Sequence, residues 1–514
     1  MSLLLYVLTA TLSFISTCIM SYIAMAIDIG PWVAPIVSIV FMLLLFQGIQ
    51  KDWFQKNIVF GIAGGSVGGM VGMCVGLTWP TFYFLHGNTF ASWIASPFKF
   101  AGMVGLLTLA AGSIAFLITF FLREHLIVEH KLRYPMSTLV HDIVYMDKKT
   151  KQSAMMAHSV AIASSWNIFT WIARLPLQHY LVYLHAIPVF VSIGFIAGHT
   201  IAIPLLIGML SRVVILMTVK ETFFYFEKEE TFLLTFASGM LFAVIVMSLY
   251  YLLRSLYVKT GKQTQLHFML LVKRFAHSRV YVTALLLSLI LCSAVFTSWG
   301  IVWMQQFYIL VALFFLCNVV AKIIGDVGVL DIQSFVSFIM LPLIYLSHMH
   351  SLQALVTTVF CTICLGIVID LMFSYKLAHL AQVDYQKILK FQIIGFIVAA
   401  CSIGFVLWWY IKTFTLGSVN LSAQQALHQE AFITFGSYNY YVLGLGFIFG
   451  AILFMLYTEM LVVIGGFMMP VYMAFWLILA GAVSYLTSRP QKYYPFWFGI
   501  YASHALWMLI RISL

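Results

Sequence analysis

Residues 58–77 read IVFGIAGGSVGGMVGMCVGL, a stretch without a single charged residue that decides the fold class. Its length matches the roughly 20 residues that a helix needs to cross the hydrocarbon core of a bilayer. Similar stretches fill the rest of the 514-residue chain, which is 63% apolar and only 8% charged. Soluble domains are about 45–50% apolar and about 25% charged. The composition therefore excludes an ordinary soluble enzyme, and it predicts an all-α polytopic membrane protein.

Charges, prolines and glycine clusters divide the chain into 16 apolar segments. The segments lie near 3–27, 31–49, 58–77, 100–122, 155–173, 181–197, 199–219, 231–257, 280–302, 305–324, 332–347, 351–373, 391–411, 433–457, 461–487 and 494–512. The sixth, seventh and eleventh are short enough to be broken or re-entrant helices. An arrangement with 14 or 15 crossings therefore remains open.

The basic residues are unevenly distributed over the connections between these segments. When each is assigned to the nearest connection, 19 of the 27 Lys and Arg residues fall on one side of the membrane and seven on the other. Lys and Arg concentrate in cytoplasmic loops, so both termini are expected in the cytoplasm. The net charge of +11 then faces anionic lipid head groups, and we expect no nucleic-acid partner.

A basic linker separates two sets of eight segments. Residues 254–279 contain six basic residues and no acidic one. We therefore predict a first eight-segment half over 1–258, a cytoplasmic linker over 259–279 and a second half over 280–514. Because both halves would start in the cytoplasm, they would be parallel pseudo-repeats.

No sequence motif indicates catalysis, a cofactor or a metal-ligand set. The chain has no Walker A loop, no HExxH and no GxSxG. This favours a transporter that is not an enzyme. A passive channel and an intramembrane enzyme acting on a lipid-linked substrate stay open as alternatives.

Polar side chains within apolar segments are costly and often line a substrate or proton pathway. Asn318, Lys322 and Asp326 repeat every four residues, which places them on one face of a helix. The glycines around Asp326 predict a break in that helix. Arg212 requires a carboxylate or an anionic substrate opposite it, and Glu459 stands alone between two Gly-rich stretches. A structural ion pair or a snorkelling side chain is the alternative for each.

The glycines of residues 61–76 recur at four-residue spacings. Small residues at this spacing let two helices approach closely. The second interpretation is a helix that unwinds to line a substrate path.

Two loop motifs carry a family resemblance. Residues 130–138 read HKLRYPMST and residues 370–380 read DLMFSYKLAHL. They resemble the L-x-Y-P-x-G-T signature and the D-L-M…K-x-G-H-L loop of the oligopeptide transporter (OPT) superfamily, in particular its metal-chelate branch, the yellow stripe-like transporters. Ser137 and Ala378 stand where that pattern has glycine. Tyr134 and Asp370 become candidate site residues through this resemblance.

Two further stretches follow in the family's order. Cys317-Asn318 with Asp326 resembles the C-N…T-D region of that branch, and Gln392-Ile393-Ile394-Gly395 resembles its Q-x-I-G. The resemblance implies proton-coupled uptake of small peptides, or of iron or another metal held by an organic chelator. A desolvated carboxyl group such as that of Asp326 or Glu459 would carry the proton.

The short loops favour a plasma membrane, in particular the inner membrane of a bacterium. The expected partners are a small-molecule substrate, protons and membrane lipids. The sequence leaves the oligomeric state open.

Overall fold

The computed structural model contains helices as its regular elements across the residues that it describes. These residues are 2–26, 51–132, 134–145, 151–173, 187–225, 229–257, 279–327, 332, 336, 349–417, 421, 423, 426, 429, 439–456, 460–468, 471–494, 496–497, 499–500, 503 and 507. The predicted segments at 31–49 and 332–347, and most of 494–512, lie outside or mostly outside this set. The same holds for the linker up to residue 278.

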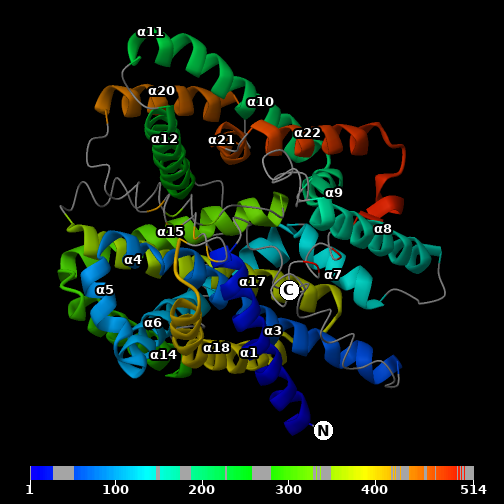
Figure 1. Ribbon diagram of the computed structural model, residues 1–514, viewed down its shortest axis with the longest axis vertical. Coiled ribbons are helices and arrows are strands. Elements are labelled where there is room, and N and C mark those ends of the chain that lie inside the picture. The colour runs from blue at the N-terminus through cyan, green and yellow to red at the C-terminus, as the bar shows by residue number, and fades with distance from the viewer. Residues whose placement is uncertain are drawn as a thin grey trace. The chain divides into compact units, whose positions relative to one another are not determined.

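Most of the predicted segments that can be compared are helices in the structure (Figure 1). The longer ones are α1 (Ser2–Ala26), α3 (Lys51–Thr78), α6 (Pro97–Arg123), α8 (Lys151–Ala173), α10 (His199–Ile215), α12 (Glu229–Tyr257), α14 (Arg279–Ser298), α15 (Trp303–Val327), α17 (Ser351–Leu380), α18 (Tyr385–Thr413), α20 (Tyr440–Leu456) and α22 (Val471–Leu486). The shorter ones are α4 (Thr81–Leu85), α5 (Gly87–Ile94), α7 (Pro135–Tyr145), α9 (Ile187–Ala197), α11 (Glu221–Phe223) and α21 (Met460–Met468).

Eight stretches of helix in the described part of the chain are long and apolar enough to cross a membrane. They are Leu3–Met25, Asn57–Leu85, Pro97–Glu129, Ala202–Phe223, Tyr281–Ser298, Trp303–Lys322, Ser351–Leu380 and Tyr385–Thr413. The protein is thus an all-α, multi-pass membrane protein, and the full number of 16 spans stays a prediction.

Several predicted segment boundaries are wrong. Helix α3 begins at Lys51 and not near residue 58, and α18 begins at Tyr385 and not near residue 391. The segment expected to end at residue 373 continues as α17 to Leu380, so most of the stretch expected as a charged loop is helix. Within the segment expected over 461–487, the described residues form α21 to Met468 and α22 from Val471.

The chain forms two compact units, and each draws on both predicted halves. Unit 1 contains Met1–Arg133, Ile245–Asp326 and Asp331–Ser437, and unit 2 contains Tyr134–Val244, Val327–Leu330 and Tyr438–Leu514. The division into halves at 1–258 and 280–514 stays a prediction.

In unit 1, α1 packs along α3 through a seam of small residues. Four glycines of α3 each face a Ser or Thr of α1, in the pairs Gly64–Thr9, Gly68–Ser13, Gly72–Thr17 and Gly76–Ser21. Helix α3 is continuous, and residues 61–76 are buried throughout. The helix-packing interpretation of the glycine repeat is therefore confirmed, and the helix does not unwind there.

In unit 2, glycines likewise allow close contacts between helices. Helix α10 packs on α21 and α22, and α9 packs on α22. Gly208 of α10 faces the α21 backbone at Gly466, while Gly466 in turn faces Leu205 of α10. Gly239 of α12 and Gly446 of α20 approach the opposite helix in the same reciprocal way.

Candidate functional site

Asp370 lies completely buried within α17, in the core of unit 1. The Ser66 hydroxyl on α3 donates a hydrogen bond to Asp370 Oδ2 at 3.0 Å. One helical turn earlier on α17, Gly366 faces the side chains of Cys74 and Met70 on α3. The absence of a side chain at Gly366 lets α17 approach α3 closely, and this contact holds the carboxyl group of Asp370 against Ser66.

The second oxygen of this carboxyl group lacks a partner. Within the described residues, Asp370 Oδ1 is buried without a hydrogen bond. A carboxylate removed from water costs several kcal/mol unless it is paired and hydrogen-bonded. Binding a proton, or a cationic group of a substrate, would remove that cost. Asp370 is therefore a buried carboxyl group within a candidate membrane span, with one oxygen hydrogen-bonded and the other without a partner among the described residues.

Other buried polar atoms of unit 1 also lack partners among the described residues. Gln392 on α18 is fully buried, and neither its Nε2 nor its Oε1 has a hydrogen bond. The same is true of Ser16 Oγ on α1 and of Trp79 Nε1, directly after α3. Protein interiors leave few such groups unpaired, and each one calls for an explanation. Four neighbouring segments of unit 1 thus offer buried donors and acceptors that a small polar solute or water could satisfy.

Arg123 makes cation–π contacts near the C-terminal end of α17, beyond Asp370. The Arg123 guanidinium, in the last turn of α6, lies 3.8 Å from the ring centroid of Tyr385 and 5.8 Å from that of Tyr375. Cation–π contacts contribute about 0.5–2 kcal/mol each, depending on exposure. They join the ends of α6, α17 and α18. Lys376, next to Tyr375, is buried at 8% exposure although it belongs to a stretch expected as a loop.

Tyr134 directly precedes α7 and has a backbone conformation that side-chain-bearing residues rarely adopt. Its φ is 45°, and Lys131 has φ of 51°. Left-handed conformations at residues other than glycine cost of order 1–3 kcal/mol and gather at functional sites. Tyr134 is also completely buried, and its carbonyl oxygen accepts hydrogen bonds from the N–H groups of Ser137 and Thr138. The motif around Tyr134 therefore fixes a helix start, with Pro135 as its first residue.

Arg212 has the carboxylate that its position requires. Its Nη2 lies 3.4 Å from Oε1 of Glu229 at the start of α12. This contact agrees with the second interpretation given for Arg212, a structural ion pair in place of a substrate-binding role.

The remaining predicted residues lie on α15 or outside the described residues. Asn318 is half-buried and Lys322 is exposed, one helical turn apart on α15. Asp326 belongs to the last turn of α15, but its side chain lies outside the described set, as does the whole of Glu459. The expected break does not occur at Gly325, since α15 continues to Val327. The roles of these residues stay predictions.

Ser66 and Arg123 were not predicted as site residues. Ser66 is the only hydroxyl-bearing residue in 58–77, and that exception within a run of glycines and aliphatic residues was the available signal. The sequence places Arg123 among the basic residues of a connection between segments, and its contact with aromatic rings depends on tertiary structure.

Residues 231–505 match the family model of the OPT oligopeptide transporter protein. No curated protein matches the chain.

Proposed function

The chain belongs to the OPT oligopeptide transporter family, whose members carry oligopeptides or related substrates across membranes, and on that premise we propose that it is a proton-coupled secondary active importer. Its cargo is a small peptide or a metal held by an organic chelator. It works in a plasma membrane, the inner membrane in a bacterium, with both termini in the cytoplasm.

The observation that supports proton coupling is the half-paired carboxyl group of Asp370. It lies in a candidate membrane span, one of its oxygens is hydrogen-bonded by Ser66, and the other has no partner among the described residues. An intramembrane carboxyl group in this setting favours states in which a proton or a cation neutralises it. If the carboxyl group binds a proton in one step of transport and a cationic group of the substrate in another, proton movement is linked to substrate movement.

The two cargo classes make different demands on the buried polar atoms. A peptide presents amide groups and a terminal ammonium, which suit the amide of Gln392 and the carboxyl group of Asp370. A metal chelate presents mainly anionic or neutral donors around a shielded ion. Asn318 would add a neutral hydrogen bond to either cargo. Asp326 and Lys322 would form an ion pair that proton binding can separate.

The test is uptake by the full chain reconstituted in proteoliposomes with an imposed pH gradient. A panel of di- to tetrapeptides is compared with ferric and nickel chelates, and each chelator is also tested without metal. A coupled importer accumulates its cargo against a gradient, whereas a channel only equilibrates it and an enzyme changes it chemically. Equilibration without accumulation for every solute in the panel would contradict the proposal.

The variant Asp370→Asn tests whether Asp370 is needed for proton coupling without disturbing the fold. Asparagine keeps the shape and can still accept from Ser66, but it cannot bind and release a proton. The variant should insert normally and lose gradient-driven accumulation. The matched control is Asp384→Asn, because Asp384 is exposed at the N-cap of α18 and asparagine caps equally well. Full accumulation by the Asp370 variant would rule out its role.

A further inference from the structure

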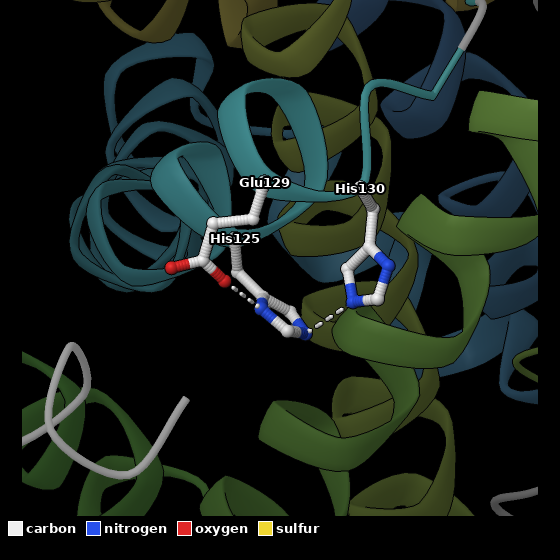
Figure 2. Close-up of polar contacts among 3 residues, drawn as sticks. All are labelled: His125, Glu129 and His130. Carbon is white, nitrogen blue, oxygen red and sulfur yellow. Dashed lines mark hydrogen bonds and ion pairs between the residues drawn. The ribbon is translucent and has the colours of Figure 1, made fainter. Parts of the chain in front are cut away.

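Three side chains form a hydrogen-bonded cluster where α6 ends (Figure 2). His125 Nδ1 lies 2.8 Å from Glu129 Oε2, and His125 Nε2 lies 3.1 Å from His130 Nε2. All three residues are accessible at the surface of unit 1, with 43% of the His125 side chain exposed. The cluster takes no part in the contacts of Asp370.

A π-helical turn brings the two histidines together. Helix α6 continues as η2 (Glu124–Glu129), and the His130 N–H donates to the His125 carbonyl oxygen at 3.0 Å, a five-residue hydrogen bond. In a regular α-helix, residues five apart point in directions that differ by roughly 140°. The wider turn instead brings position 130 close to position 125, and the two imidazole rings lie edge to face with their centroids 4.4 Å apart. Single π-helical turns often occur at functional sites.

The geometry of the two rings suits a shared metal ion. Imidazole nitrogens bind zinc at about 2.0–2.1 Å, and two nitrogens 3.1 Å apart at that distance subtend an angle of roughly 100° at the metal. This value lies between the octahedral and tetrahedral angles. Figure 2 shows the Nε2 atoms of His125, near the start of η2, and of His130, directly after η2, facing each other. A small rotation of the two exposed rings would aim both lone pairs at one point.

Glu129 supplies the outer contact that histidine ligands usually have. Metal-bound histidines almost always donate their other ring N–H to a carboxylate or carbonyl group, which fixes the tautomer and the ring orientation. Since a carboxylate only accepts, His125 Nδ1 carries the proton toward Glu129. In the neutral imidazole, the lone pair of His125 Nε2 then faces His130.

We propose that His125 and His130 bind one borderline divalent transition-metal ion, Zn²⁺ or Ni²⁺, through their Nε2 atoms, with Glu129 orienting His125. The ion replaces the proton shared by the two nitrogens, and that proton leaves to solvent. Among the described residues no group of three or more His, Cys, Asp or Glu side chains could hold a metal ion. In this proposal, water or donor atoms of a small chelator complete the coordination. Imidazole ligands suit these metals.

The first experiment measures metal binding to the purified full chain in detergent micelles. Metal-free protein is dialysed against ZnCl₂ or NiCl₂, and bound metal is counted by mass spectrometry. The His125→Gln, His130→Gln double variant should bind one ion fewer than the unsubstituted protein. His379→Gln is the control, because His379 is an exposed histidine at the end of α17 and its loss should leave binding unchanged. Equal stoichiometry and affinity in the double variant would overturn the site.

Two further measurements separate a metal site from a structural cluster. Glu129→Gln should keep the stoichiometry but weaken the affinity by about 10–100-fold, the usual effect of losing an outer-shell partner. With Cu²⁺ as the probe, electron paramagnetic resonance should show two imidazole nitrogens, and one in His130→Gln. Unchanged affinity in Glu129→Gln would refute the orienting role. A single nitrogen in the unsubstituted protein would refute the shared ion. Because all of these readouts measure binding, a failure of transport leaves them unaffected.

Discussion

Replacing Gly68 with alanine adds one methyl group to the seam between α3 and α1. The new Cβ would lie 2.6 Å from the Ser13 carbonyl oxygen and 2.9 Å from Ser13 Cα. Favourable contacts between carbon atoms occur at about 3.5–4.0 Å, and because both Ser13 atoms belong to the backbone, the two helices must separate by about 1 Å.

The separation has two costs and one compensation. Overpacking of this kind costs about 1–3 kcal/mol. The 3.0 Å hydrogen bond from Thr17 Oγ1 to the Gly68 carbonyl oxygen would lengthen, and a typical hydrogen bond contributes about 0.5–1.5 kcal/mol. Alanine favours the helix over glycine by about 1 kcal/mol. The free energy of unfolding should therefore fall by roughly 1–3 kcal/mol.

The matched control is Gly102→Ala on α6, where nothing lies within 4 Å of the added Cβ. There only the helix preference acts, so the stability should stay equal or rise by up to about 1 kcal/mol. Reversible unfolding in mixed micelles, followed by far-ultraviolet circular dichroism, measures both variants. If Gly68→Ala proves as stable as Gly102→Ala, the close seam between α1 and α3 is wrong.

Three other predictions address charge and orientation. Asp326→Asn should insert normally and lose gradient-driven accumulation, and adding Lys322→Met should not restore it; full recovery in the double variant would show that the pair is only a structural bridge. Single cysteines introduced at Lys262 and at Glu229 should react with an impermeant thiol reagent from opposite sides of the membrane, and same-side labelling would overturn the 16-span topology. Arg123→Lys should lower the unfolding free energy by about 0.5–1 kcal/mol, because lysine stacks poorly on two rings, and an unchanged melting temperature would refute the stacking.

Apolar patterning predicted the helices well but misplaced the end of α17. The pattern treats Asp370 and Lys376 as polar residues that end a span. Both are buried against protein, at 0% and 8% exposure, so the helix continues past them. Hydropathy describes partition between water and lipid, and it does not register a polar side chain that faces another helix.

The parts of the candidate site differed in how far they could be predicted. Asp370 was found only through the family resemblance of its motif, and its partner Ser66 depends on the contact between α3 and α17. The pairing of His125 with His130 could not be read from periodicity, because a helical analysis assumes about 100° per residue. A π-helical turn changes that angle, and its position depends on packing beyond the local sequence.

The hydrogen bonds of α1 have a consequence for the order of biogenesis. The Thr9 hydroxyl bonds to Leu5 of its own helix, so it is satisfied as soon as α1 forms. The Ser13 hydroxyl instead donates at 2.6 Å to the Gly395 carbonyl oxygen of α18, 382 residues further along the chain. At translation rates of about 5–20 residues per second, that acceptor emerges roughly 20–75 seconds after Ser13 is made. During this interval the nascent chain must retain α1 in the membrane, and the glycine seam of α3 is the partner available to hold it until α18 arrives.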